Sequence, residues 1–474
     1  MTASIRAVPN IDGADTTSPR ITLIGGGSFH WAPRLLADFC NTPSLAAAHV
    51  VLHDLDHAAA ERMAALGREF AARRSIGMQV EAVADLPSAL AATDFVIAAF
   101  SVGGLHSMRR DLDVPERFGI RQPIGDSIGP GGLSRALRSV PPVLDMARAV
   151  ERSAPDALFV NVSNPLTALT RAITRETPVR AVGLCNELVG LQFQLSLLFD
   201  VPMHEIDLTV GGVNHFPIVT AIGLGDDPDG FTRLLEVVEV APPPGPLWMQ
   251  PPEGMHWRKV SGGGEFTKAD VVANLAVKLE LFRRFGALPG ANDHHIVEFL
   301  PGFVHPDNGD GEPWHVHHWG IDGHAADAAA DVAHYEAMRD AADVTRIPSG
   351  ELVAALLDGI VSGVPHTLPM NLPNAGQVTT LPSDVVVECM GVSDAAGVRP
   401  RDATAVPGII GEYVRRASVC QELTVEAALS GDVDVAIAAM LADPLAGRLP
   451  YERAVELTLA LLAETAEWLP QFRR

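Results

Sequence analysis

Two short segments each place a candidate metal ligand just after an expected strand. The apolar residues 182–184 lead into Cys185, and residues 206–210 lead into Gly211-Gly-Val-Asn-His215. Thiolate and imidazole groups both bind divalent metals. If the two strands are neighbours in a sheet, their ends bring Cys185 and His215 together, so we predict a site for one divalent metal. The alternative is that both side chains are ordinary core residues.

A glycine-rich turn near the N-terminus is suited to a dinucleotide. The apolar residues 21–24 run into Gly25-Gly-Gly27-Ser28-Phe29, and a helical pattern follows. Glycine lets the backbone approach a pyrophosphate, and the free N–H groups of the first helical turn face it. The G-x-G-x-x-G pattern is incomplete, because His30 occupies its third glycine position. A second expected strand ends in Asp54, which can bind ribose hydroxyls. An ordinary strand-to-helix turn is the alternative.

Three more segments could meet a ligand, and the first and third of them follow expected strands, where ligands of a doubly wound sheet bind. The loop 101–111 carries Arg110 and Asp111, which either meet the substrate or are solvated surface charges. Residues 125–132 form a second glycine-rich helix entrance, suited to an anion or a sugar hydroxyl. Asn161 and Asn164 bring two amides to a third strand end, where they suit a nicotinamide or a sugar.

The elements that must position these residues alternate between strand and helix up to about residue 205. This rhythm predicts an α/β fold, with an N-terminal, doubly wound parallel sheet of the Rossmann-like type. Beyond residue 205 two further strands are expected and then mostly helices, which predicts a C-terminal α+β domain. We therefore expect a dinucleotide-binding domain over residues 1–204 and a substrate, metal and oligomerisation domain over residues 205–474.

The composition limits the partners. The 474 residues carry a formal net charge of −23, which disfavours a nucleic acid or an anionic membrane. The four cysteines are widely spaced and form no C-x-x-C pair, which favours a reducing compartment. The N-terminal segment lacks the apolar core of a signal peptide, and we expect a cytoplasmic enzyme.

The ordered motifs resemble glycoside hydrolase family 4 along nearly the whole chain. They are GGGS, HDLD, IGPGG-x-x-x-ALR-x-x-P, NVSNP, G-x-CN, G-x-NHF, the run Asp293-His-His295-Ile-Val-Glu298-Phe, and Asn371-Leu-Pro-Asn374-Ala-Gly376. The chain also resembles a sister group, the NAD-dependent sulfoquinovosidases. The resemblance implies a requirement for NAD and a divalent metal, manganese above all, a sugar glycoside as substrate, and a homodimer or homotetramer.

The resemblance also implies roles for single residues. The metal ligands would be Cys185 and His215. Catalytic groups would be Asp293 and Asp111, with Asp293 as the base. The expected NAD contacts are Gly25, Gly27, Ser28, Phe29, Asp54 and Asn161, and the expected substrate contacts are Arg110, Asn164, Asn186 and His295.

The implied reaction is hydrolysis through transient redox chemistry. In the reaction that the resemblance implies, bound NAD takes a hydride from C3 of the sugar, a base removes the C2 proton, and the C1 aglycone leaves by elimination. Water then adds at C1, C2 is reprotonated and the retained NADH reduces C3, so that there is no net oxidation. We expect an α-glycoside of a hexose, or of a hexose with a phosphate, carboxylate or sulfonate at C6. Arg109, Arg110, Arg258 and Lys259 are candidates to bind such an anion, with plain surface charges as the alternative.

Three departures from the family pattern leave the sugar open. Asp126-Ser127 stands where the family usually has Glu-Thr, and Asn186 stands where several members have an acidic Asp. The tyrosine base of several members has no counterpart near Asp293. The alternatives are a simple NAD-dependent dehydrogenase of a sugar or hydroxy acid, and an NAD-sensing protein without catalytic activity.

Overall fold

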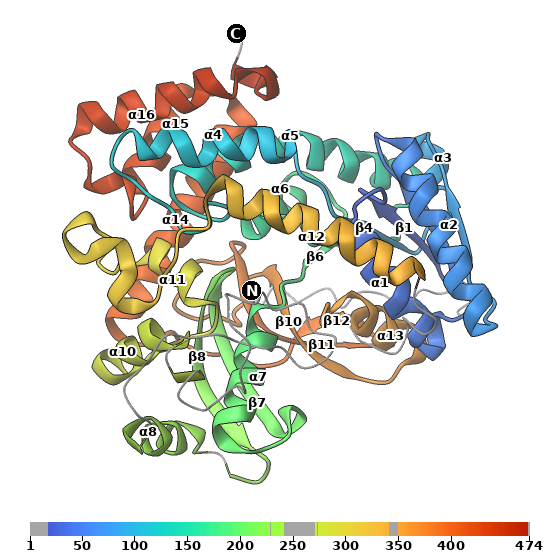
Figure 1. The fold of residues 1–474 in the computed structure, drawn as a ribbon, viewed down its shortest axis with the longest axis horizontal. Coiled ribbons are helices and arrows are strands. Elements are labelled where there is room, and N and C mark those ends of the chain that lie inside the picture. Colours follow the sequence, from blue (N-terminus) through green and yellow to red (C-terminus); the bar gives the residue numbers. More distant parts are fainter. Residues whose placement is uncertain (1–17, 228, 241–270, 273, 341–348, 473–474) are drawn as a thin grey trace, which may run out of the picture.

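The N-terminal part of the protein is a parallel sheet with helices on both faces (Figure 1). The computed structural model describes residues 18–227, 229–240, 271–272, 274–340 and 349–472. The first strands lie in the order β3-β2-β1-β4-β5-β6 and all pair in parallel. They are β1 (Arg20–Ile24), β2 (His49–His53), β3 (Gln79–Ala82), β4 (Phe95–Ala98), β5 (Leu158–Asn161) and β6 (Arg180–Gly183).

Right after most of these strands the chain enters a helix, as the alternating pattern predicts. Two of the helices are capped by aspartates, since Asp56 accepts the N–H of Ala59 and Asp85 accepts that of Ser88. The helices are α1 (Trp31–Asn41), α2 (His57–Arg74), α3 (Leu86–Leu90), α4 (Gly104–Glu116), α5 (Gly129–Ser153), α6 (Leu166–Glu176) and α7 (Glu187–Phe199).

The second half of the chain extends the same sheet with antiparallel strands. Asn371 of β10 pairs with Gly183 of β6, and the order continues β6-β10-β11-β7-β8-β9, with β12 beside β11. Over the described residues this makes one 12-stranded sheet. The added strands are β7 (Ile206–Val213), β8 (Phe216–Leu224), β9 (Leu288–Pro289), β10 (His366–Pro373), β11 (Val386–Asp394) and β12 (Gly397–Pro400).

Helices cover this second part and return to the first. In Figure 1, α14, α15 and α16 stand beside α4 and α5, and α12 crosses in front of the sheet. They are α8 (Gly230–Val240), α10 (Ala276–Phe285), α11 (Asp293–Phe299), α12 (Gly320–Asp340), α13 (Val353–Ser362), α14 (Gly408–Ser430), α15 (Val433–Ala442) and α16 (Tyr451–Glu464). The fold class predicted from the sequence, α/β with a Rossmann-like N-terminal sheet, is confirmed.

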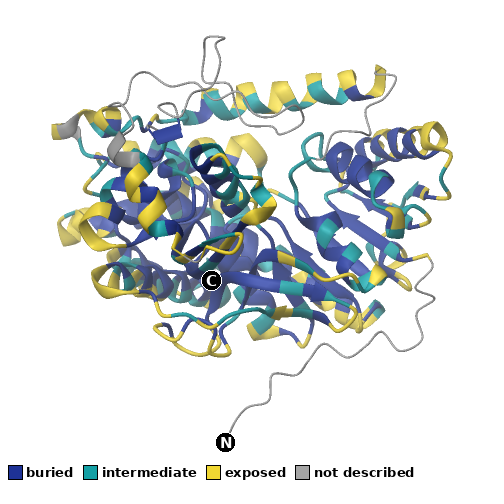
Figure 2. Ribbon diagram, turned by 90° about the horizontal axis from the view of Figure 1, so that it is seen from below, coloured by how far each residue is buried: buried dark blue, intermediate teal, exposed yellow. Residues whose placement is uncertain are grey.

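Two expectations about individual elements are wrong. Cys185 and His215 follow β6 and β7, but these strands are not neighbours, because β10 and β11 lie between them. Arg110 and Asp111 lie on helix α4 rather than on a loop, since the helix starts at Gly104. Figure 2 shows the sheet strands mostly buried and the exposed residues mostly on the outer helices. No helix of the described residues is long and apolar enough to span a bilayer.

Candidate active site

One pocket collects candidate site residues from both halves of the chain. Its cavity measures about 310 Å³. Five residues that the sequence singled out line it together, namely Asn164, Cys185, Asn186, His215 and His295. Other lining residues are His30, Trp31, Arg34, Asp126, Val162, Leu184, Glu187, Val189, Ser349, Gly350 and Glu351.

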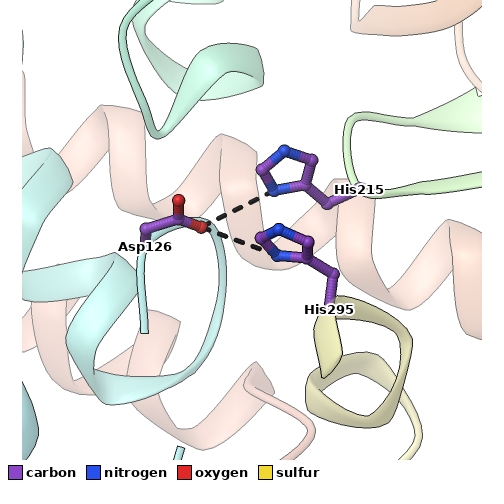
Figure 3. A group of neighbouring side chains, drawn as sticks. All are labelled: Asp126, His215 and His295. Atoms are coloured by element: carbon purple, nitrogen blue, oxygen red, sulfur yellow. Dashed lines mark ion pairs between the residues drawn. The ribbon is translucent and has the colours of Figure 1, made fainter. Parts of the chain in front are cut away.

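Three side chains in this pocket have the chemistry and spacing of a metal site. Asp126, His215 and His295 each present one ligand atom, and these atoms all lie within 4.8 Å of one another (Figure 3). Asp126 comes from the loop before α5, His215 from the turn between β7 and β8, and His295 from α11. A carboxylate with two imidazoles suits divalent transition metals such as manganese, so these residues fit the ion that the family resemblance implies.

Cys185 lies beside this group. Its thiol is hydrogen-bonded to His215, and burial raises the pKa of the thiol above its ordinary value. The predicted closeness of Cys185 and His215 therefore holds although β6 and β7 are separated.

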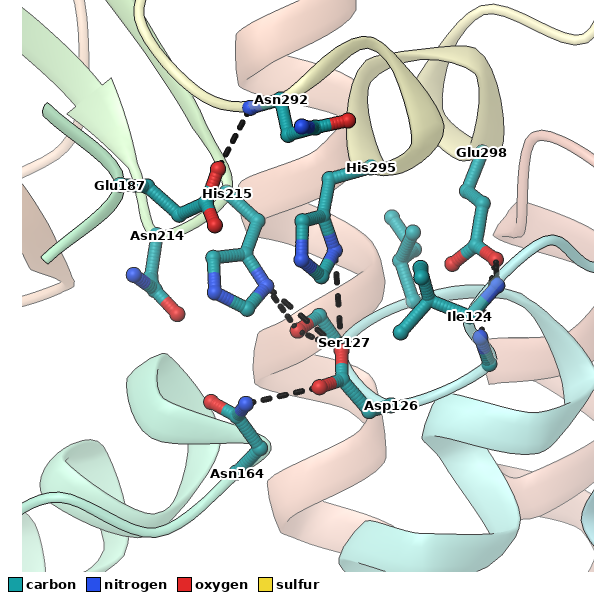
Figure 4. Close-up of polar contacts among 12 residues, drawn as sticks. Ile124, Asp126, Ser127, Asn164, Glu187, Asn214, His215, Asn292, His295 and Glu298 are labelled. Atoms are coloured by element: carbon teal, nitrogen blue, oxygen red, sulfur yellow. Dashed lines mark hydrogen bonds and ion pairs between the residues drawn. The ribbon is translucent and has the colours of Figure 1, made fainter. Parts of the chain in front are cut away.

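Asp126 makes polar contacts with several neighbouring side chains of the pocket (Figure 4). Its Oδ2 accepts a hydrogen bond from Asn164 Nδ2 at 2.8 Å, and its Oδ1 accepts one from Ser127 Oγ at 2.7 Å. The Nδ1 atoms of His215 and His295 lie 3.6 Å and 3.8 Å from Oδ1. Burial acts to raise the pKa of Asp126, but His215 and the other nearby cations hold it well below its usual range. Asp126 is therefore an anion at all ordinary pH values.

The rings of His215 and His295 lie with their centroids 3.8 Å apart and their planes tilted by 32°. Burial lowers the pKa of His295 to about 4, and the charge of His215 acts in the same direction. A neutral imidazole at His295 is the form that binds metal. His215 adopts a left-handed backbone with φ of 65°, which is unusual for a residue with a side chain. The tight turn after β7 thus aims this imidazole into the pocket.

The turn after β1 has the close contacts expected of a dinucleotide-binding loop. Gly25 has φ of 87°, and a Cβ there would lie 1.9 Å from the carbonyl oxygen of Ala99. The N–H of Gly27 donates to Asp54 Oδ2 at 3.0 Å, and Ser28 Oγ accepts the N–H of Trp31 at 3.2 Å. Phe29 packs edge-on against Tyr335 of α12, with ring centroids 5.2 Å apart. Gly25, Gly27, Ser28 and Asp54 therefore lie together at the end of β1.

Several predicted site residues do not line the pocket. Asp293 is 4% exposed and accepts the N–H of Val277 at 2.8 Å, and Lys278 Nζ lies 3.1 Å from its other oxygen. Asp111 is fully buried in a two-pronged pair with Arg138, at 2.8 Å and 2.5 Å. Asn161 is also fully buried, and its Oδ1 accepts the N–H of Ser163. All three side chains are therefore bonded to other groups in the protein interior.

The arginines expected to bind an anion also lie elsewhere. Arg110 donates to the carbonyl of His106, approaches Glu467 at 3.7 Å and stacks on Trp468. Arg109 is exposed on the same helix, α4. Residues 258 and 259, the other two cationic candidates, lie outside the described residues. Among the described residues that line the pocket, Arg34 is the one arginine.

Among the pocket residues that had no predicted role in the sequence are Arg34, Asp126, Glu187 and Glu351. Asp126 lies in the glycine-rich entrance that was expected to bind an anion or a hydroxyl, in the loop between α4 and α5, and its carboxylate faces two imidazoles. Glu187 directly follows the predicted residues Cys185 and Asn186, so its place after the end of β6 was the signal available for it. Arg34 and Glu351 carried no such signal, because they reach the pocket through packing between distant segments.

Comparisons with known proteins identify the family. The model described as family 4 glycosyl hydrolase matches residues 20–201, and that of its C-terminal domain matches residues 210–446. An α-galacturonidase of Bacillus subtilis strain 168 is 33% identical over 439 residues, which cover 90% of this chain and 93% of the relative. The chain belongs to glycosyl hydrolase family 4. The resemblance seen in the sequence is thereby confirmed, and the protein is an NAD-dependent glycosidase.

Solved structures of family 4 share the fold over nearly the whole chain. The structure of the glucosidase lplD from Bacillus subtilis has a TM-score of 0.81 at 30% identity, covering 94% of this chain and all of that one. A 6-phospho-α-glucosidase from gut microorganisms, in complex with NAD and Mn²⁺, has a TM-score of 0.76 at 19% identity, covering 96% of this chain and all of that one.

Proposed function

We propose that this family 4 enzyme is an NAD- and manganese-dependent α-galacturonidase. The proposal rests mainly on the likeness to the α-galacturonidase of Bacillus subtilis, at 33% identity over 90% of the chain. The pocket supports it, since a candidate metal group faces amides suited to sugar hydroxyls. The activity named for that relative favours a uronide, and the likeness gives no support to a sulfoquinovoside.

The side chains at the two cofactor positions fit the groups that family 4 uses. Asp126, His215 and His295 would hold the manganese ion, with Cys185 beside them. Gly25, Gly27 and Ser28 would face the pyrophosphate of NAD, and Asp54 the adenosine ribose, which favours NAD over NADP because a 2′-phosphate would meet a carboxylate. When bound, NAD supplies a hydride acceptor for C3 and manganese supplies the Lewis acidity that makes the C2 proton removable.

We assign the removal of the C2 proton to Glu187 instead of Asp293. Glu187 lines the pocket and lies next to His215 and His295 in Figure 4. One of its oxygens accepts the N–H of Asn292 at 2.6 Å, which fixes the side chain. Asn164 and Asn186, which also line the pocket, would orient the hydroxyl groups of the sugar. Elimination at C1 then needs little acid catalysis, so that Asn186 suffices where other family members have an aspartate.

Arg34 is the residue that we propose for the C6 carboxylate. Its side chain is 4% exposed, yet it lines the pocket, and its Nε has no hydrogen-bond partner among the described residues. Its other nitrogens bind the carbonyl of His30 and Asp331 of α12. Glu351 is nearby, and burial raises its pKa to about 7, so that about half of it is uncharged at neutrality and its repulsion of an anion is reduced.

The test compares two substrates that differ only at C6. With NAD and Mn²⁺ present, we expect kcat/KM for a nitrophenyl α-galacturonide to exceed that for the matching α-galactoside. Arg34→Met should lower this ratio about tenfold or more, because a charge-assisted hydrogen bond is lost. General damage to the fold would lower both rates and leave the ratio unchanged. Equal rates on both substrates in the wild-type protein would refute the galacturonide assignment.

The same assay separates a glycosidase from a simple dehydrogenase. In the proposed reaction NAD is reduced and reoxidised within one turnover, so that sugar and aglycone are released without accumulation of NADH. A steady rise in NADH absorbance in step with substrate consumption would instead establish a dehydrogenase.

A further inference from the structure

Glu298 forms hydrogen bonds with the backbone of the loop that carries Asp126. Its side chain is 1% exposed, and its Oε1 accepts hydrogen bonds from the backbone N–H groups of Ile124 at 2.8 Å and Gly125 at 2.9 Å (Figure 4). These two residues immediately precede Asp126. The Glu298 side chain does not line the pocket, so its contact with the loop is internal.

The same side chain belongs to the helix that carries His295. Both residues lie on α11, three positions apart, so that they project from the same side of the helix. Glu298 therefore links the Asp126 loop to the helix that carries His295, although residues 126 and 295 are far apart in the sequence. Nδ1 of His295 has no hydrogen-bond partner among the described residues, and it lies 3.8 Å from Asp126 Oδ1.

Burial of the Glu298 carboxyl group lowers the stability of the fold. The second oxygen of Glu298 has no hydrogen-bond partner among the described residues, and burial raises the pKa of the group to about 8. An unpaired buried polar atom destabilises a fold. The two backbone hydrogen bonds offset part of this cost. They hold the loop that carries Asp126 in place.

We infer that Glu298 is a positioning residue that sets the separation of Asp126 and His295 for the divalent metal. The inference rests on the metal site of the proposed function. Residues behind a metal site that orient its ligands commonly change metal affinity 10- to 100-fold when they are replaced. Glu298 would act on two of the three candidate ligands at once, by joining the loop of one to the helix of the other.

The test measures Mn²⁺ affinity directly on the full-length protein, without substrate. Metal-free protein is titrated with Mn²⁺, and free Mn²⁺ is followed by electron paramagnetic resonance. We expect Glu298→Met to weaken binding about tenfold or more. Glu298→Gln should bind like the wild type, because its amide oxygen still accepts the two N–H groups. A tenfold loss in Glu298→Gln would overturn the positioning role in favour of a role for charge.

Asn374 offers a matched control. It is 2% exposed, and its Oδ1 accepts the backbone N–H groups of Gly376 and Val378, so it also holds a loop by two such bonds. Its Nδ2 adds hydrogen bonds to the carbonyl groups of Val378, Leu381 and Pro382, so its loss should disturb the fold at least as much as the loss of Glu298. It does not line the pocket. Asn374→Leu should lower the unfolding temperature and leave Mn²⁺ affinity unchanged. Equal weakening by Asn374→Leu and Glu298→Met would overturn the inference, because it would reflect loss of stability alone.

Further variants separate this inference from the metal site itself. Asp126→Asn and His295→Ala should both weaken Mn²⁺ binding strongly, and unchanged affinity in both would refute the metal site. Weak binding in those variants together with wild-type affinity in Glu298→Met would refute the role of Glu298 only. If Glu298→Met does not fold, Glu298→Asp takes its place, since the shorter side chain pulls the loop and Asp126 out of position. Wild-type affinity in that variant would again refute the role.

Discussion

At the scale of single residues, two carboxylates compete for the role of base. Glu187 lines the pocket beside the imidazoles, whereas Asp293 is paired with Lys278 outside it. Glycosidase chemistry of this type requires a base within reach of C2. The position of a carboxylate in the pocket is therefore better evidence for this role than the sequence motif in which it occurs. The sequence favoured Asp293 because it opens a recognisable run, and the structure favours Glu187.

Replacing each carboxylate by its amide tests this assignment. Glu187→Gln should lower kcat by about 10²- to 10⁴-fold and abolish deuterium incorporation at C2 in deuterated water. Asp293→Asn should instead lower the free energy of unfolding by about 3–5 kcal/mol, because Lys278 is left buried without its partner. Mass spectrometry of the product and thermal unfolding supply the two measurements. Loss of C2 exchange in a folded Asp293→Asn variant, with exchange kept in Glu187→Gln, would restore Asp293 as the base.

At the scale of elements, the turn between β1 and α1 depends on one close approach. A Cβ on Gly25 would meet the carbonyl oxygen of Ala99, at the end of the neighbouring strand β4. This turn and that strand end form the edge of the sheet at which NAD would bind. The N–H of Gly27 is held by Asp54, so the acid at the end of β2 also shapes the turn.

Gly119 provides a control for a substitution in this turn. Gly25 and Gly119 both have positive φ, at 87° and 77°, but a Cβ on Gly119 would meet nothing within 4 Å. Alanine at either position should cost about 1–2 kcal/mol of backbone strain. Gly25→Ala should in addition weaken NAD binding, measured by fluorescence titration, because the turn must move away from β4. Unchanged NAD affinity in Gly25→Ala would show that this turn does not hold the cofactor.

At the scale of the whole molecule, the pocket lies where the two halves of one sheet meet. Asp126, Asn164 and Cys185 come from the first half, and His215 and His295 from the second. The junction holds several buried carboxyl groups with raised pKa values. Burial raises the pKa of Glu298 to about 8, and those of Glu351 and Glu388 to about 7. In the unfolded chain such groups titrate near pH 4.3.

These groups predict the pH dependence of stability of the metal-free protein. Between about pH 5 and 8 the folded state still holds protons that the unfolded chain has released, so the free energy of unfolding falls as pH rises, by up to about 1.4 kcal/mol per pH unit for each retained proton. The slope flattens above about pH 8, because these groups then ionise in the folded state as well. Chemical denaturation at several pH values measures this slope. Glu298→Gln should make the slope shallower, because its amide does not titrate. The same slope in that variant would show that Glu298 is already ionised in the folded protein.

Features that depend on neighbours along the chain could be predicted from the sequence. The strand, turn and helix around Gly25, the strand end at Asp54 and the parallel first half of the sheet all follow from short-range patterns of apolar residues and glycines. The placement of Cys185 and His215 at strand ends was also visible, and so was the family. Each of these features involves one segment and its immediate continuation.

Only the tertiary structure decided which strand ends meet and which polar groups are already paired. The insertion of β10 and β11 between β6 and β7, the union of Asp126 with His215 and His295, and the burial of Asp111 against Arg138 all depend on contacts between segments far apart in the sequence. A carboxylate in a motif looks the same whether it faces a pocket or a buried cation. Packing and strand register decide between these outcomes, because the cost of burying a charge is met only where a partner from another segment arrives.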